Sequence, residues 1–163
     1  KSNSTLISKN LIFKPTENQH AAEILRHSNI PANISKKIFD EAQAITKNFA
    51  EKLNYVGTLN LEFMIDHEDN LYFNEYANRP HNGFWHSVNS YKYSQFSTHI
   101  KAILGLAFIE NIKISNAEMY NILGSEILEY RKKTFKKNEF FYDYLKKEPR
   151  QGRKMGHLTI LKN

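Results

Sequence analysis

Apolar and polar residues alternate in two neighbouring segments near the middle of the chain. From Leu59 to Ile65 every second residue is apolar, and Leu71-Tyr72-Phe73 resumes after the polar stretch 66–70. A period of two indicates half-buried strands, and a cluster of Asp, Glu and Asn between them indicates a turn. The pattern therefore predicts a β-hairpin in which Asp66 pairs with Leu71 across a four-residue loop, so that Glu62 lies opposite Glu75.

Residues 35–53 instead carry apolar residues at helical spacing, with Lys and Glu between them. These apolar residues are Ile38, Ala42, Ile45, Phe49 and Leu53. Pro31 breaks the chain before this segment, and either Asn33 or Ser35 can cap the helix. A second helix is predicted from Ser94 to Gly105, because glycine readily adopts the left-handed conformation that ends helices.

The remaining segments are shorter. Residues 6–14 predict a strand, followed by a loop through Pro15 and Asn18; residues 22–27 predict an extended segment, with a helix nearly as compatible. Residues 79–93 predict an irregular stretch. After Gly105, short apolar stretches at 109–114, 119–123, 140–145 and 157–161 are separated by polar turns. Together these patterns predict an α+β fold, with a small β-rich domain that begins near residue 107.

Length and composition narrow the classes of protein. A chain of 163 residues can form one full domain or two small ones. It contains no cysteine, which excludes disulfides, thiolate metal sites and a thiol nucleophile. No apolar run reaches the length of a membrane span and no signal peptide is evident, so a cytoplasmic protein that does not bind membranes is expected. The net charge of +6 admits nucleic-acid binding.

Glu62 and Glu75 are the first candidate site residues. Two carboxylates on one face of a sheet repel each other unless a cation lies between them. Mg²⁺ with nucleotide phosphates suits such a pair, because Mg²⁺ prefers one or two carboxylates plus phosphate oxygens. The spacing alone is equally compatible with two solvated carboxylates on an exposed face. Shifting the register by one residue would place them on opposite faces.

Four stretches of the chain, in this order, carry a family resemblance: NYVGTLNLEFM, LYFNEYANRPHN, YSQFSTHIKAILGL and YLKKEPRQGRKMGHLTIL. Together they resemble the C-terminal half of the N5-carboxyaminoimidazole ribonucleotide synthetases, which are ATP-grasp ligases of purine biosynthesis and form the ATPase subunit of phosphoribosylaminoimidazole carboxylase. The stretch PTENQHAAEILRHSNIPANIS is also similar to that family. The resemblance implies that residues 1–107 form the C-terminal lobe of an ATP-grasp domain, an antiparallel sheet with packed helices, and that residues 108–163 form a small β-rich domain.

The resemblance also implies a reaction and its cofactors. Enzymes of this family use ATP to carboxylate 5-aminoimidazole ribonucleotide with bicarbonate, through carboxyphosphate, and release ADP and phosphate. By resemblance, Glu62 and Glu75 hold two Mg²⁺ ions, and Asn74 and Glu75 contact the nucleotide. Arg79 binds bicarbonate or carboxyphosphate, and His81 and Asn82 line the place where carboxyphosphate meets the amine. Without the resemblance, Arg79 reads as a surface salt-bridge partner and His81 as a capping residue.

A second cluster is basic and lies near the end of the chain, around Gly152. Its members are Tyr144, Lys146, Lys147, Arg150, Arg153 and Lys154. Such a cluster fits either a nucleic-acid patch or a pocket for one phosphate monoester. No stacking aromatic residues are interleaved with residues 150–154, and the resemblance favours the pocket, with Lys146, Arg153 and Lys154 on the 5′-phosphate of the ribonucleotide. The basic run 131–137 has no partner motif and is interpreted as a solvated face.

The chain departs from the family at two places. The usual Ser-Gly-His-aromatic segment after the RPHN motif is Gly83-Phe84-Trp85-His86-Ser87 here, and Asn78 replaces a frequent proline. The N-terminal domain and the first ATP-grasp lobe are not found in these residues, so the isolated chain is expected to fold at least in part without ligase activity. The complete enzyme is expected to be a homodimer. Two alternatives stay open: another ATP-grasp carboxylating or formyl-transferring ligase, and a basic module that binds nucleic acid without catalysis.

Overall fold

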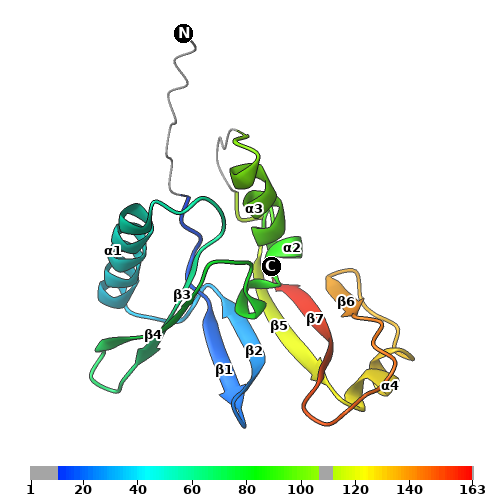
Figure 1. The fold of residues 1–163 in the computed structure, drawn as a ribbon. Helices are drawn as coiled ribbons and strands as arrows, with labels where there is room; N and C mark the ends of the chain where they lie inside the picture. Colours follow the sequence, from blue (N-terminus) through cyan, green and yellow to red (C-terminus); the bar gives the residue numbers. More distant parts are fainter. Residues whose placement is uncertain (1–10, 107–111, 163) are drawn as a thin grey trace.

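The computed structural model describes residues 11–106 and 112–162, which form two antiparallel sheets and several helices (Figure 1). The larger sheet has five strands in the order β1-β2-β5-β7-β6, and the smaller is the hairpin β3-β4. The strands of the larger sheet are β1 (Glu17–Ala21), β2 (Ile24–Ile30), β5 (Asn116–Leu123), β6 (Glu139–Asp143) and β7 (Lys154–Lys162). An α+β fold with antiparallel sheets and packed helices is therefore confirmed.

The hairpin consists of β3 (Asn60–Ile65) and β4 (Leu71–Ala77), and its apolar face packs on helix α1 (Lys36–Leu53). Helix α1 begins at Ser35, whose side chain accepts a hydrogen bond from the Ile38 amide at 3.4 Å, as a helix cap should. The Phe49 ring lies 5.3 Å from the ring of Tyr76 and 6.3 Å from the ring of Phe73. The helix thus covers one face of the hairpin and leaves the face that carries Glu62 and Glu75 for other contacts.

The larger sheet joins segments that are far apart in the sequence. Strand β2 pairs with β5, so that Ile30 lies opposite Ala117. Ile30 and Ala117 form a buried cluster with Phe84 and Tyr91. A second buried cluster surrounds Ile122, Ile127, Met155 and Leu158 on the C-terminal part of the sheet. One continuous sheet therefore supports residues from both sides of the domain boundary predicted near residue 107.

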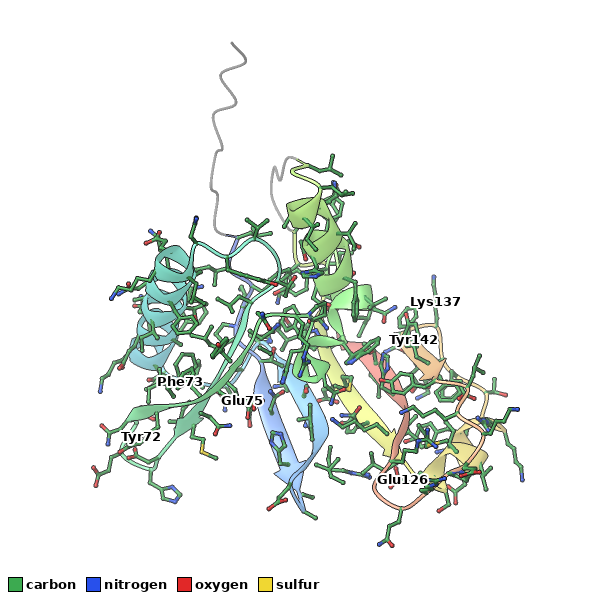
Figure 2. All side chains as sticks on the ribbon, viewed as in Figure 1. Tyr72, Phe73, Glu75, Glu126, Lys137 and Tyr142 are labelled. Atoms are coloured by element: carbon green, nitrogen blue, oxygen red, sulfur yellow. The ribbon has the colours of Figure 1, made fainter. Side chains whose placement is uncertain are left out.

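Three short helices follow the hairpin. The 3-10 helix η1 (Asn82–Phe84) and helix α2 (Ser87–Ser90) lie within the stretch that the sequence predicted to be irregular. Helix α3 (Gln95–Ile103) begins one residue after its predicted start at Ser94, which caps it. Gly105 has φ of 64°, in agreement with the left-handed conformation predicted at the end of α3. Figure 2 shows Tyr72, Phe73 and Glu75 on the hairpin, and Lys137, Tyr142 and Glu126 at the other side of the molecule.

Some sequence-based assignments are wrong. Residues 11–14 of the predicted strand 6–14 are not in a strand, and residues 6–10 lie outside the described residues. Strand β1 instead occupies the predicted loop around Asn18. Its sequence, ENQHA, has no apolar alternation because β1 is an edge strand that is held by backbone pairing with β2. The short helix α4 (Glu126–Tyr130) was not anticipated, and only residues 112–114 of the apolar stretch 109–114 are described.

Candidate active site

The carboxylates of Glu62 and Glu75 lie on one face of the hairpin. As predicted, Glu62 is the pairing partner of Glu75, but the register differs from the predicted one. Ile65 rather than Asp66 pairs with Leu71, and a bulge between Glu62 and Phe63 then offsets the difference. Asn74 is the extra residue of this bulge. If the bulge were absent, the observed pairing of Ile65 with Leu71 would place Asn74 opposite Glu62, and Glu75 would point to the other face.

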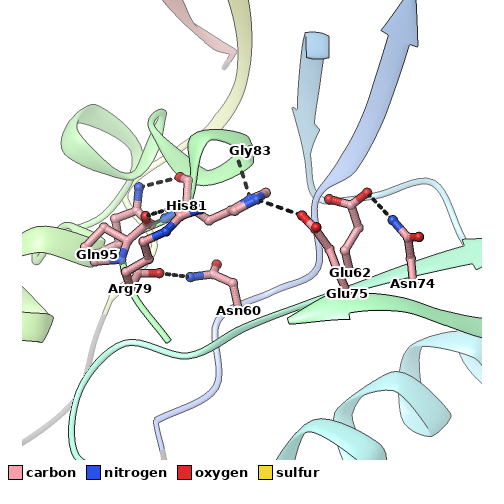
Figure 3. Close-up of polar contacts among 9 residues, drawn as sticks. Asn60, Glu62, Asn74, Glu75, Arg79, His81, Gly83 and Gln95 are labelled. Atoms are coloured by element: carbon pink, nitrogen blue, oxygen red, sulfur yellow. Dashed lines mark hydrogen bonds and ion pairs between the residues drawn. The ribbon is translucent and has the colours of Figure 1, made fainter. Parts of the chain in front are cut away.

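Two carboxylates and one imidazole meet at this face. One carboxylate oxygen each of Glu62 and Glu75 and one ring nitrogen of His81 lie within 4.8 Å of one another (Figure 3). Asn74 donates from Nδ2 to Oε1 of Glu62 at 3.1 Å, and Nε2 of His81 lies 3.7 Å from Oε1 of Glu75. The two acidic groups that the sequence singled out are therefore close enough to share one cation or a pair of cations.

The contacts of the His81 ring indicate which of its nitrogens accepts a hydrogen bond and which donates one. The amide of Gly83 donates to Nδ1 of His81 at 3.3 Å, so a neutral ring carries its proton on Nε2, the atom that faces Glu75. Burial lowers the pKa of His81, while the carboxylates of Glu62 and Glu75 act in the opposite direction. The lowered pKa favours the neutral ring, and in the tautomer that accepts the Gly83 hydrogen bond, Nε2 is a donor on the side of the carboxylates.

The segment 78–82, which follows β4 and carries the RPHN motif, is held by side chains from elsewhere in the chain. The hydroxyl of Tyr55 donates to the Asn78 carbonyl at 2.6 Å, and Nδ2 of Asn60 donates to the Arg79 carbonyl at 2.8 Å. The side-chain amide of Gln95 bonds both backbone groups of His81. Sequence reasoning missed these three residues, because contacts over 14 to 23 positions leave no trace in local spacing.

Arg79 and Asn82 also have polar groups available to a ligand. The guanidinium of Arg79 is exposed and donates to the Pro80 carbonyl at 3.2 Å. Among residues 11–106 and 112–162 it forms no ion pair, in contrast to a surface salt-bridge partner. Asn82 opens η1, and its Nδ2 is buried without a hydrogen-bond partner in the described part of the chain. Within the described residues, a guanidinium without an ion pair and a buried donor without a partner fit an anionic ligand.

The basic cluster places two of its lysines together. Nζ of Lys146 donates to the Lys154 carbonyl at 2.5 Å, and burial together with the charge of Lys146 lowers the pKa of Lys154. The charge of Lys154 also acts to lower the pKa of His81, so the start of β7 lies within electrostatic reach of the segment 78–82. Arg153 donates to the Glu148 carbonyl at 3.3 Å, whereas Arg150 forms an ion pair with Glu148.

An aromatic cluster adjoins the basic residues, because Nζ of Lys146 lies over the ring of Tyr144. The cluster includes part of the divergent segment 83–87. The Trp85 ring lies 5.6 Å from the ring of Tyr144 and 5.1 Å from the ring of His157. His157 packs locally: it is fully buried, and its Nδ1 lies 3.0 Å from the Tyr144 hydroxyl. His86 is also fully buried, and its Nδ1 lies 3.0 Å from the Ser90 hydroxyl. Trp85 and His86, which belong to the segment that departs from the family, therefore both make structural contacts.

Comparison with known proteins defines the class. The ATP-grasp domain model matches residues 6–96, and the model of the phosphoribosylaminoimidazole carboxylase C-terminal domain matches residues 117–163. The chain therefore belongs to the ATP-grasp family. Within that family it is similar to the N5-carboxyaminoimidazole ribonucleotide synthases: it is 36% identical over 154 residues to the enzyme of Staphylococcus saprophyticus and 38% identical over 152 residues to that of Staphylococcus epidermidis. The family resemblance seen in the sequence is thereby confirmed.

Solved structures support the same relationship. The chain superimposes on the N5-carboxyaminoimidazole synthetase of Staphylococcus aureus complexed with ADP with a TM-score of 0.85 and 35% identity, covering 93% of this chain and 41% of that one. The enzyme of Aspergillus clavatus in complex with ADP and 5-aminoimidazole ribonucleotide matches with a TM-score of 0.81, 25% identity and coverage of 90% and 42%. The chain spans about two fifths of the length of these relatives. Within the described residues, no helix is both long and apolar enough to cross a membrane.

Proposed function

We propose that this chain is the C-terminal part of an ATP-dependent ligase that carboxylates 5-aminoimidazole ribonucleotide with bicarbonate, through carboxyphosphate, to give N5-carboxyaminoimidazole ribonucleotide, ADP and phosphate. The observation that carries the proposal is the opposition of Glu62 and Glu75 beside His81. This face joins carboxylates for a metal–nucleotide complex to an arginine and a neutral imidazole for an anion. The similarity to the staphylococcal synthases supports the identity of the substrates.

The carboxylate pair fits magnesium by its donor set. Its oxygens lie within 4.8 Å of each other, and the described residues place no cation between them, so they repel each other unless an ion binds. Glu62 and Glu75 would hold the magnesium that accompanies ATP, which would supply positive charge to offset the charge on the transferring phosphoryl group. The pair would hold two such ions, and Asn74 would keep Glu62 in place through its hydrogen bond.

Arg79 and His81 would act on the carboxylate substrate. The planar guanidinium of Arg79 can bind two oxygens of bicarbonate or carboxyphosphate at once, which suits an anion better than lysine does. Nδ1 of His81 accepts from Gly83, so the proton of the neutral ring is on Nε2, on the side of the carboxylate pair. Nε2 would donate this proton in a hydrogen bond to an oxygen of an intermediate bound there. Asn82 would supply to the same anion its Nδ2, which has no hydrogen-bond partner among the described residues.

Lys146, Arg153 and Lys154 would bind the 5′-phosphate of the ribonucleotide. Lys146 and Lys154 are half-buried, and burial together with the charge of Lys146 lowers the pKa of Lys154, so a dianionic phosphate would offset the repulsion between them. Lys154 is also the residue of this cluster that interacts electrostatically with His81. The amine of the bound ribonucleotide would in this way be directed toward the carboxyphosphate.

Joining this chain to the N-terminal part of the Staphylococcus saprophyticus synthase tests the function. The joined protein is expected to release ADP only when both bicarbonate and 5-aminoimidazole ribonucleotide are present, while this chain by itself is expected to have no ligase activity. Release of ADP with equal rate in the absence of the ribonucleotide would refute the proposed substrate. The same preparation tests the expected homodimer by sedimentation equilibrium.

Binding of nucleic acid is the contrasting function for a basic chain. Arg150 is engaged by Glu148, and Arg131 forms an ion pair with Asp143, which reduces the free charge of both basic segments. We expect no tight, steeply salt-dependent binding of RNA or DNA to this chain. A titration at two salt concentrations measures this directly, because phosphate contacts give a strong salt dependence.

A further inference from the structure

We propose that Gln95 is a positioning residue of this site, which fixes the backbone of His81 and with it the orientation of the catalytic segment 78–82. The inference rests on the proposed function, since it concerns how the ligase site is held. It assigns a role to a residue that touches neither the carboxylate pair nor the basic cluster.

The contact between Gln95 and His81 is double. The backbone amide of His81 donates to Oε1 of Gln95 at 2.8 Å, and Nε2 of Gln95 donates to the His81 carbonyl at 2.8 Å (Figure 3). One side-chain amide therefore satisfies both backbone groups of one residue, as a neighbouring strand would. Gln95 itself is fully buried, so water cannot readily take its place.

Gln95, the first residue of α3, is in turn held by three hydroxyl groups. Its backbone amide donates to the Ser87 hydroxyl at 3.1 Å, and its carbonyl accepts from the Thr58 hydroxyl at 3.0 Å and from the Thr98 hydroxyl at 3.1 Å. Thr58 lies two residues before β3, the strand that carries Glu62. As the first residue of α3, Gln95 therefore ties the segment with His81 to the beginning of the hairpin strand and to α2.

This connection matters because the segment 78–82 has no strand or helix of its own before η1 begins. Its direction depends on side-chain contacts, and Gln95 supplies two of them at the residue whose ring faces Glu75. Displacement of reacting groups by about 1 Å can cost about 100-fold in rate. Loss of Gln95 should thus reduce kcat, while the affinity for ATP should change little.

The test compares two buried amides in the ligase formed by joining this chain to the N-terminal part of the Staphylococcus saprophyticus synthase. Gln95→Met removes both bonds to His81 at similar volume. Asn121→Leu is the matched control, because Asn121 is buried and its Nδ2 donates to the Leu25 carbonyl at 2.9 Å, in the larger sheet. We expect kcat to fall about 10- to 100-fold in Gln95→Met with KM for ATP within about threefold, and kcat to stay within about threefold in Asn121→Leu.

Amide hydrogen exchange separates this inference from the proposed function. In this chain without its partner half, exchange of the His81 amide should accelerate at least about tenfold in Gln95→Met and remain unchanged in Asn121→Leu. If the joined wild-type protein shows no turnover, the proposed function fails and the exchange measurement alone decides the positioning role. If Gln95→Met does not fold, Gln95→Glu replaces it in the test. This variant keeps the acceptor for the His81 amide and loses the donor to the His81 carbonyl, so it should also lower kcat. Equal losses in the Gln95 and Asn121 variants, or unchanged exchange at His81, would overturn the inference.

Discussion

Replacing Glu75 by glutamine should stabilise the metal-free chain and at the same time abolish its response to magnesium. The carboxylate oxygens of Glu62 and Glu75 lie within 4.8 Å of each other. Two unit charges at about this distance repel by about 1 kcal/mol in water and by about 3 kcal/mol at an effective dielectric constant of about 20. The Glu75 side chain is 61% exposed, so the lower value applies. Removal of one charge should therefore raise the free energy of unfolding by about 1 kcal/mol.

Magnesium should reverse this order of stability. An ion that binds only the folded chain stabilises it by about 1.4 kcal/mol for each tenfold increase in concentration above its dissociation constant, and two ions give about twice that slope. The slope thus counts the ions that the carboxylate pair holds. In Glu75→Gln, which retains only Glu62 and a neutral amide, the slope should fall close to zero.

Urea unfolding followed by circular dichroism, repeated over a series of magnesium concentrations, measures both effects. Glu129→Gln is the control, because it removes an exposed carboxylate from α4, away from the hairpin, and changes the net charge equally. It should leave the magnesium slope intact. The reasoning would be refuted if Glu75→Gln destabilised the metal-free chain or retained the wild-type slope.

Two further predictions concern the basic cluster and the buried histidines. Arg153→Met in the joined ligase should raise KM for 5-aminoimidazole ribonucleotide by about tenfold or more and leave KM for ATP unchanged in steady-state kinetics, because one charge-assisted hydrogen bond contributes about 1.5–3 kcal/mol. Lowering the pH from about 7.5 to 5.5 should destabilise this chain. Burial lowers the pKa of His86 to about 3 and that of His157 to about 4. Both then bind protons in this range only when unfolded, so each costs about 1.4 kcal/mol per pH unit below its unfolded pKa of about 6.5. Urea unfolding at the two pH values should show a smaller loss in His157→Gln, and a loss equal to that of the wild type would contradict the assignment.

The hairpin shows how far local patterns can determine a site. Alternation located both strands and their turn, and the opposition of Glu62 and Glu75 was predicted correctly. The pairing of Asp66 with Leu71, on which that prediction relied, is wrong by one residue. The bulge at Asn74 compensates for the error, and the sequence has no glycine or other signal there that could have revealed it. A correct pair was therefore reached through an incorrect register.

The helices were easier to predict than the edge strand. Helices α1 and α3 each bury one side and begin after a serine cap. The sequence predicted the start of α3 at Ser94 and left Asn33 or Ser35 as the cap of α1. Strand β1 has neither an apolar stripe nor a turn signal, and it exists because β2 offers hydrogen bonds to its backbone. Gln95 was invisible as a site residue for the same reason, since its partner lies 14 residues away in a segment without periodicity.

The position of the basic cluster relative to the carboxylate pair depends on a sheet that crosses the predicted domain boundary. Lys154 opens β7, β7 pairs with β5 along its whole length, and β5 pairs with β2. Strand β2 contacts η1, which directly follows His81. The electrostatic influence of Lys154 on His81 is thus a consequence of strand pairing between the two halves of the chain. The two family models match residues 6–96 and 117–163, but the two parts of the proposed site are joined through one sheet, so their relative position depends on the pairing of β2 with β5.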